Sequence, residues 1–423
     1  MNPEIKNTNY YFISGMLLFA FVLNFMSEIT YGIFRLGVLD EVASLVILSA
    51  GVLILFSLKK ATIVNMDFII LFTVLSLIYI IFYYNNFLSF IYEYYKLFIF
   101  LIFLPILKFF KPDGLQKFLK ILFWFFIIVL FVNLIFIVLQ YVTSNKILAI
   151  IQYNELRVSG WERLGRYTGL FDVATLGSTS LLIMLLNEIG NRDKKSHRVL
   201  FVLALISVVF SSSKASYVIL ILWFIIYHKD VLIKNFLQIF LALSVLITVF
   251  VAYTFKAIQA KIVQYGYFFE KIQNPNLINL TDVEKRALFW AESIKIFMSN
   301  PFGIGFGTFG DTSAKLNPKP YKMNSRRWEE GYVYMSDSTF SHLLAEQGVT
   351  MLLYFLVLIF PLFIGSKRIA WKFSVLLVVF YVVQILFTMG FSSGSWPIIF
   401  AFIYALIYYS KKFDTIFDKK HAI

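Results

Sequence analysis

Long apolar runs alternate with short polar connections along almost the whole chain. Runs of about 17–25 apolar residues are long enough to cross a bilayer as helices. The pattern predicts about twelve membrane-spanning helices, at residues 10–27, 38–58, 67–84, 90–107, 119–142, 168–188, 198–210, 215–228, 233–254, 338–364, 373–390 and 395–410. The short seventh and eighth either cross fully or form a hairpin bent at 211–214. We therefore predict an all-α integral membrane protein, with residues 1–423 forming a single polytopic domain.

One connection differs from the others in length and composition. Residues 256–337, between the ninth and tenth predicted helices, form a long polar loop that contains Arg, Lys, Asp, Glu, Gly and Trp. A membrane protein that only moves solutes can keep its connections short. The long loop therefore predicts chemistry at a membrane surface.

Basic residues gather in alternate connections, which predicts the orientation of the chain. They occur around 59–60, 108–120, 192–198, 229–234, 367–372 and 411–420, whereas the intervening short connections around 28–41, 84–89 and 391–395 carry a single Arg. Cytoplasmic connections of membrane proteins are enriched in Lys and Arg. Both termini are therefore expected in the cytoplasm and loop 256–337 outside. The formal net charge of +14 then follows mostly from topology and requires no nucleic acid partner.

The chain contains no Cys, which excludes disulfides, thiolate metal sites and a Cys nucleophile. Its four His residues are scattered, and their spacing is not that of metal ligands. We therefore predict no metal site.

Four of the cations on the predicted outer side are candidates for a functional role. Arg163 and Arg166 directly precede the sixth helix, Lys214 lies at the turn of the short pair, and Arg286 begins a helix in the long loop. The ordinary interpretations are an interfacial anchor for Arg166, a solvated turn for Lys214 and a solvated surface for Arg286. The sharper interpretation is a set of cations for a lipid-linked phosphate, whose oxygens match the planar fork of Arg.

The second half of the long loop predicts a helix followed by a tight turn. Residues 281–284 resemble a capping box, and Asn300-Pro301 ends the helix. Its predicted apolar stripe consists of Ala287, Trp290, Ala291, Ile294, Phe297 and Met298. The glycine run 303–310, with Gly305 and Gly307, has no preceding strand and no following Gly-Lys-Ser/Thr, so it is not a nucleotide-binding loop. We interpret it as a turn that brings backbone close to a neighbour or a ligand.

Two carboxylates mark the start of the tenth helix. Asp337 is either the N-cap of this helix or a catalytic base. Glu346 follows nine residues later, about 13 Å deeper at 1.5 Å per residue. His342 is its i, i+4 partner, so the two can share a hydrogen bond. The alternative is a structural polar contact between helices.

Four segments, taken in order, are similar to the bacterial O-antigen polymerase and O-antigen ligase superfamily. They are 166–171, 213–214, 286–309 and 337–348. The resemblance implies a glycosyltransferase of the bacterial inner membrane that uses a polyprenyl-diphosphate-linked oligosaccharide as donor. Arg166 and Arg286 are the implied catalytic cations, and Asp337 is the implied base. The implied substrate-binding residues are Arg163, Lys214, Trp290, Gly305, Gly307, His342 and Glu346.

The implied reaction takes its energy from the donor's own diphosphate bond, so no cofactor is expected. A chain-length regulator and a flippase in the same membrane are candidate partners. Ligases carry His at the position of Asp337, which favours a polymerase of O-antigen or capsule repeat units here. This chain also has Lys214 where many relatives have Arg, and Thr175 where they have Asn.

Three alternatives remain. A ligase would share the fold and the donor but transfer the glycan to a lipid A–core acceptor. A flippase of lipid-linked oligosaccharides would be expected to show repeated halves and charges that line a central cavity, neither of which the sequence shows. A channel or scaffold would explain neither the glycine run nor the outer arginines.

Overall fold

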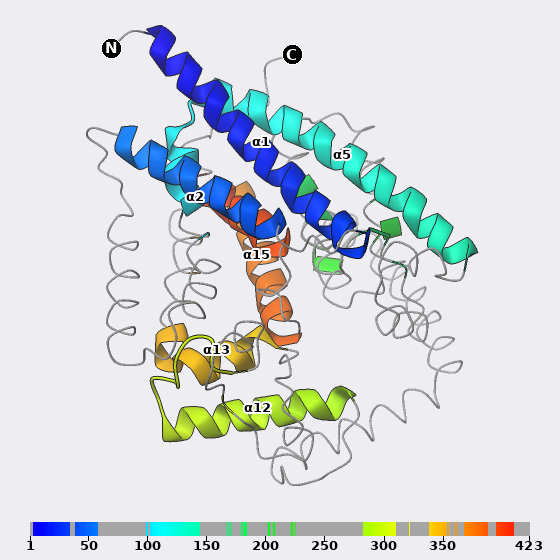
Figure 1. The fold of residues 1–423 in the computed structure, drawn as a ribbon, viewed down its shortest axis with the longest axis vertical. Coiled ribbons are helices and arrows are strands. Elements are labelled where there is room, and N and C mark those ends of the chain that lie inside the picture. The colour runs from blue at the N-terminus through cyan, green and yellow to red at the C-terminus, as the bar shows by residue number, and fades with distance from the viewer. Residues whose placement is uncertain are drawn as a thin grey trace.

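The computed structural model describes residues 3–33, 39–57, 99, 102–143, 167, 169–170, 179–180, 182–183, 202–203, 206–207, 221–222, 225, 282–309, 321, 338–352, 355, 359, 362, 368–387 and 395–409. Within these residues every regular element is a helix (Figure 1). The predicted all-α class is confirmed. The predicted helices at 67–84 and 233–254 lie outside the described residues, and those at 90–107, 168–188, 198–210 and 215–228 lie largely outside them.

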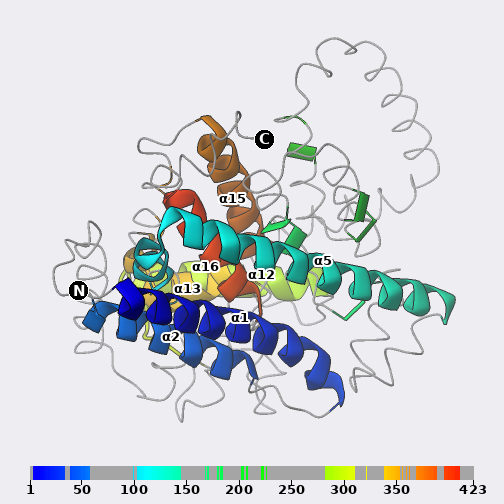
Figure 2. The same ribbon diagram turned by 90° about the horizontal axis from the view of Figure 1, so that it is seen from above.

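Helices α1 (Pro3–Ile33) and α2 (Leu39–Ser57) pack against each other over much of their length (Figures 1 and 2). Both contain the apolar stretches that the sequence predicts, Tyr11–Ser27 and Glu41–Ile54. These stretches pack together because each carries small or branched residues, such as Ala20 and Ala50, that are fully buried. They form one side of the bundle.

Helix α5 (Pro112–Val142) begins seven residues before the predicted start because Pro112 occupies its first turn. One face is buried, and it includes Phe118, Leu122, Phe126 and Leu130. The other face is apolar but exposed, at Ile121, Trp124, Ile128, Phe131, Ile135 and Val138. Among the described residues, α5 is the one helix that is long and apolar enough to cross a membrane. The number of twelve spans therefore stays a prediction.

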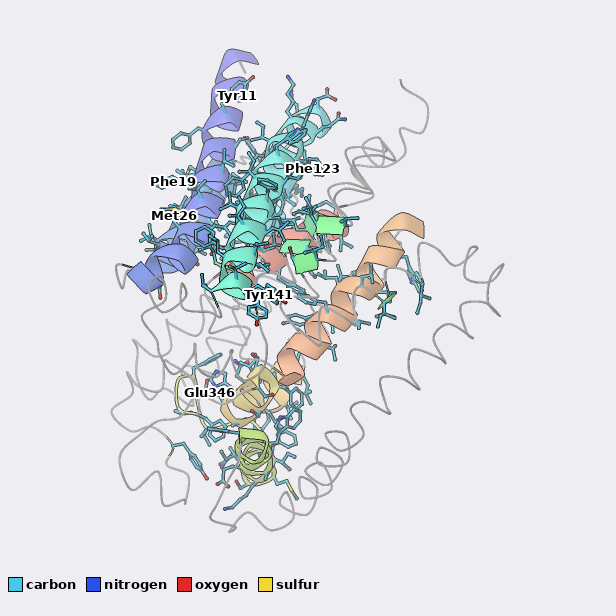
Figure 3. The ribbon with its side chains drawn as sticks, turned by 90° about the vertical axis from the view of Figure 1, so that its right-hand side faces the viewer. Tyr11, Phe19, Met26, Phe123, Tyr141 and Glu346 are labelled. Atoms are coloured by element: carbon cyan, nitrogen blue, oxygen red, sulfur yellow. The ribbon has the colours of Figure 1, made fainter. Side chains whose placement is uncertain are left out.

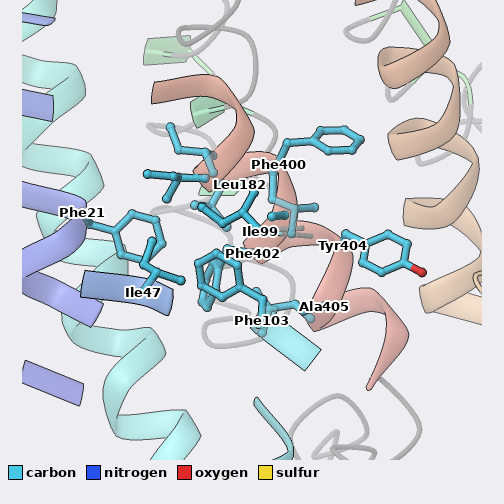
Figure 4. Packing of buried hydrophobic residues seen from close by; sticks show 14 of the residues in the cluster. Phe21, Ile47, Ile99, Phe103, Leu182, Phe400, Phe402, Tyr404 and Ala405 are labelled. Atoms are coloured by element: carbon cyan, nitrogen blue, oxygen red, sulfur yellow. The ribbon is translucent and has the colours of Figure 1, made fainter. Parts of the chain in front are cut away.

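The bundle core forms around α16 (Ser395–Tyr408), whose residues 397–407 are all buried. Phe402 of α16 makes an edge-to-face contact with Phe21 of α1, at a centroid distance of 5.3 Å. Phe21 makes a similar contact with Phe126 of α5, at 5.7 Å. Figure 4 shows Phe21, Phe103 and Phe402 converging with aliphatic residues from other segments. Aromatic interlocking of this kind stabilises the core through buried area and edge geometry.

Helices α12 (Asp282–Ser299) and α13 (Thr339–Gln347) pack together at one end of the bundle, as Figures 1 and 3 show. Helix α15 (Arg368–Phe387) connects the two regions, because it contacts both α13 and α16. In Figure 3, Tyr141 at the C-terminal end of α5 lies toward the half of the molecule that holds Glu346. The candidate site is therefore built at this end.

Candidate functional site

Helix α13 is short and almost entirely buried. Its N-cap is Ser338, whose side chain accepts from the Ser341 N–H at 3.3 Å. The N-cap alternative for Asp337 is therefore wrong, and Asp337 itself lies outside the described residues. The predicted continuous helix over 338–364 is also wrong, because α13 ends at Gln347 and Gly348 adopts a φ of 55°. A glycine in this left-handed region commonly ends a helix.

Residues 300–309, which we call the glycine loop, fold against the C-terminal end of α13. The N–H groups of Ile304 and Gly305 donate to the carbonyls of Ala345 and Glu346, each at 3.0 Å. The last carbonyls of a helix have no partner within it, so the loop supplies partners from another segment. Across the break, the Val349 N–H donates to the Pro301 carbonyl at 2.8 Å.

The glycines are required by this close approach. Gly303, Gly305 and Gly307 have φ values of 81°, 107° and 68°, a region that side chains disfavour. A Cβ on Gly303 would also collide with the backbone of Glu346, and one on Gly348 with the Pro301 carbonyl. The interpretation of the run as a tight turn close to a neighbour is confirmed. The neighbour is α13.

The Glu346 carboxylate is the polar centre of this contact. It is fully buried, and its Oε1 accepts from the backbone N–H groups of Thr308 at 2.6 Å and Phe309 at 2.8 Å. Its Oε2 lies 3.5 Å from Nε2 of His342, which is also buried. Nδ1 of His342 contacts the Phe309 carbonyl, which can only accept, so Nδ1 carries a proton. The predicted His342–Glu346 pairing is confirmed as a contact.

The geometry of the pair restricts its chemistry. Oε1 of Glu346 faces the two loop N–H groups, whereas Oε2 faces the His342 ring. A buried carboxylate is costly unless its oxygens have such partners. The pair and the two loop N–H groups join α13 to the glycine loop, so the alternative of a structural polar contact describes what Glu346 does here.

Helix α12 covers the other side of the glycine loop. Its bounds match the predicted helix, but the buried face is displaced from the predicted stripe. The buried residues are Phe289, Glu292, Ser293 and Ile296, while Ile294 and Met298 are exposed. Phe289, Ile296, Phe309 and Ala345 form a small apolar cluster, with Tyr321 packed against it. The stripe prediction is therefore wrong by about one position in the helix.

Sequence reasoning missed Glu292, because a carboxylate on a loop helix usually faces water. The Tyr321 hydroxyl donates to Glu292 Oε1 at 2.5 Å, and Lys295 Nζ lies 3.7 Å from the same oxygen. Burial raises the pKa of Tyr321 above its ordinary value, and the hydrogen bond to Glu292 raises it further. Glu292 takes its hydrogen bond from Tyr321, which lies 29 positions away in the sequence. The apolar pattern of α12 cannot reveal a partner at that distance.

Trp290, a predicted substrate-binding residue, stacks on Phe340 of α13 with ring centroids 5.0 Å apart and planes 22° apart. The structure thus brings Trp290, Gly305, Gly307, His342 and Glu346 together in one assembly of α12, the glycine loop and α13, which we call the loop–helix unit. Arg286 is described only as a helical residue of α12. Arg163, Arg166, Lys214 and Asp337 lie outside the described residues.

No curated protein matches the chain significantly. Residues 199–356 do match a family model described as O-antigen ligase, and this segment contains the whole loop–helix unit. The match covers less than half of the chain, and over this segment it indicates a function of O-antigen ligase or polymerase type. It confirms the resemblance of the chain to the O-antigen polymerase and ligase superfamily.

Proposed function

We propose that this protein is a polysaccharide polymerase of the bacterial inner membrane. It transfers a growing glycan from polyprenyl diphosphate to a sugar hydroxyl of a new lipid-linked repeat unit on the outer face. The observation that carries this proposal is the loop–helix unit, a buried polar assembly at one end of an apolar bundle and inside the segment that matches the O-antigen ligase model.

The exposed apolar face of α5 supports the membrane setting. Side chains such as Trp124, Ile128 and Ile135 are about half exposed on one face of a 30-residue apolar stretch. Apolar area of this extent is unfavourable in water and favourable against lipid.

The same proposal includes about twelve spans, cytoplasmic termini and an external loop at 256–337. An enzymatic reporter that works only outside the cytoplasm, fused after Lys315, should be active; an inactive fusion beside an active cytoplasmic reporter at Lys315 would contradict this orientation.

The Trp290–Phe340 stack supports a joint role for Arg286 and Asp337. Arg286 precedes Trp290 by one helical turn, and Asp337 comes directly before Ser338, the N-cap of α13. Since the stack joins the N-terminal halves of both helices, it favours placing the cation and the carboxylate at the same end of the unit. A fixed cation beside a base is what this transfer needs.

In the proposed step, the bond between the donor sugar's anomeric carbon and the diphosphate oxygen breaks. The acceptor oxygen forms the new bond to that carbon, and its proton passes to Asp337. The electron pair leaves with the diphosphate, whose developing charge is neutralised by Arg166, Lys214 and Arg286. Arg163 assists in binding the donor. Glu346 and His342 hold the glycine loop against α13.

The polymerase assignment is supported by Asp337, which stands where ligases carry His. A strain that lacks the gene tests the assignment when its surface glycan is separated on a gel. Loss of long chains with one repeat unit still attached is expected for a polymerase. Loss of every attached unit would instead identify a ligase and overturn the assignment.

A further inference from the structure

Helix α5 carries two buried amide side chains within its apolar stretch, Asn133 and Gln140. They are seven residues apart, which places them two turns apart on the same face. Both face the short segment Gly169–Leu170, a turn just after Arg166 and Tyr167. Burial of two uncharged amides in an apolar helix is costly unless each is hydrogen-bonded.

Their hydrogen bonds go to backbone rather than to other side chains. Nε2 of Gln140 donates to the Gly169 carbonyl at 2.6 Å, and the Gly169 N–H donates back to Oε1 of Gln140 at 3.0 Å. The Leu170 N–H donates to Oδ1 of Asn133 at 2.6 Å. The two amides therefore satisfy three consecutive polar groups of a turn, and we call this arrangement the amide clamp.

Within the amide clamp, only glycine fits at position 169. Its φ is 73°, and an added Cβ would collide with the side chain and the carbonyl of Asn133. In a membrane protein, non-helical backbone at the depth of the lipid tails is tolerated only where protein or water satisfies its polar groups. Asn133 lies nine residues before the end of α5, about 14 Å along the helix. Here the two amide side chains of α5 are the hydrogen-bond partners of the backbone groups in the turn.

The segment just before the turn is also held to α5. The ring of Tyr167 makes an edge-to-face contact with Tyr141, with centroids 5.5 Å apart. Arg166 is bonded directly to Tyr167, so consecutive Cα atoms there are about 3.8 Å apart. Whatever fixes Tyr167 and Gly169 therefore limits where the Arg166 backbone can be.

We propose that Asn133 and Gln140 are positioning residues that hold the Gly169–Leu170 turn against the end of α5, and that donor binding through the preceding Arg166 depends on this hold. The inference rests on the proposed function for the role of Arg166. The clamp itself rests on the three hydrogen bonds and the Tyr141–Tyr167 contact alone.

The first measurement tests positioning without using activity. Because the chain has no Cys, Tyr141→Cys and Tyr167→Cys introduce the only two thiols, which a short bifunctional thiol-reactive reagent, such as a bis-methanethiosulfonate, can join in membranes. We expect efficient crosslinking in this parent and a severalfold lower yield after Asn133→Leu or Gln140→Leu. Val138→Leu, on the exposed face of α5, is the matched control and should leave the yield unchanged.

A conservative variant sharpens this test. Asn133→Asp keeps an oxygen that can accept the Leu170 N–H, so it should retain the crosslinking yield that Asn133→Leu loses. Parent-like crosslinking in both Asn133→Leu and Gln140→Leu would overturn the inference. Equal losses in Asn133→Asp and Asn133→Leu would also overturn it, because the acceptor bond would then not be what holds the turn.

The second measurement is the affinity of the purified protein, without the added cysteines, for polyprenyl diphosphate. Asn133→Leu and Gln140→Leu should raise Kd about tenfold, the effect of misplacing one charged hydrogen-bond donor. Partial unfolding alone would lower the amount bound at saturation and leave Kd unchanged. A parent-like Kd in clamp variants that have lost crosslinking would overturn the positioning role.

Arg166→Ala separates the two proposals. It should crosslink like the parent and bind polyprenyl diphosphate at least as weakly as the clamp variants. A parent-like Kd in Arg166→Ala would remove Arg166 from the proposed function, whereas the crosslinking of Asn133→Leu would still decide whether the clamp holds the turn.

Discussion

The bundle core and the loop–helix unit are both buried, but different forces hold them together. In the core, Phe21, Phe126 and Phe402 meet edge to face, and aliphatic side chains fill the remaining space. In the loop–helix unit, the decisive contacts are directional: the Glu346 carboxylate accepts two loop N–H groups, and loop N–H groups cap the end of α13. Apolar packing depends mainly on volume, whereas these bonds depend on the position of particular atoms.

This difference indicates where chemistry can be supported. A catalytic arrangement must be held within a fraction of an ångström, which requires partners with fixed geometry. The bundle core can change its side chains and still exclude water. The loop–helix unit cannot exchange Glu346 or Gly303 without moving the glycine loop relative to α13. The following predictions use this contrast.

The largest effect is expected from Asp337→Asn, which keeps the shape of the side chain and removes its ability to take a proton. A general base contributes roughly 10²–10⁴-fold to a rate, so polymer synthesis in membranes matched for protein should fall by that order. Ser338→Ala is the matched control, because it removes the N-cap of α13 and should cost about 1 kcal/mol of stability while the rate per folded molecule is kept. Full-length polymer from Asp337→Asn would remove Asp337 from the mechanism.

The next largest effect is on stability, from Glu346→Leu. This variant leaves the Thr308 and Phe309 N–H groups buried without their acceptor, at about 1–3 kcal/mol each. Glu346→Gln keeps an accepting oxygen and should cost less than half as much. Thermal unfolding in detergent measures both. Equal losses in the two variants would show that the charge, and not the acceptor geometry, holds the glycine loop.

Two glycines provide a comparison of opposite sign. Gly303→Ala forces a side chain into a left-handed backbone and against the carbonyl of Glu346, so we expect a loss of at least 1–2 kcal/mol. Gly15→Ala, in α1, meets nothing within 4 Å and should stabilise its helix by up to about 1 kcal/mol. Unfolding midpoints that move in the same direction would contradict the close approach of the loop to α13.

The sequence predicted the helices well where hydropathy and local stop signals decide them. The bounds of α12 follow from a polar start and Asn300-Pro301, and α2 and α16 fall within a few residues of their predicted runs. The break at Gly348 was not predictable from hydropathy, because the apolar run continues across it. It forms because Pro301 of the glycine loop, 48 residues before Val349, supplies its carbonyl to the Val349 N–H.

The contacts of the loop–helix unit could be predicted from the sequence only where they are local. His342 and Glu346 were paired correctly because i, i+4 spacing is local information. The loop N–H groups that bind Glu346 come from 37 and 38 residues away, and no local pattern encodes them. The buried face of α12 was misjudged for the same reason: Glu292 turns inward to meet Tyr321, so counting apolar residues gave the wrong face.

A smaller effect than that of Glu346→Leu is expected from Tyr321→Phe, which removes the hydroxyl that donates to Glu292 and keeps the ring that packs against Phe309. The loss should be about 1–2 kcal/mol, since Lys295 remains near the carboxylate.

Burial raises the pKa of Tyr321 in the folded protein, so the unfolded chain releases this proton first. The stabilisation is therefore fully present below about pH 10 and declines as the pH rises above it. The stability difference between the parent and Tyr321→Phe should be constant from pH 7 to about 9.5 and shrink at higher pH. A difference that grows above pH 10 would show that the hydroxyl is ionised more readily in the folded protein, and that the contact with Glu292 is not a hydrogen bond from Tyr321.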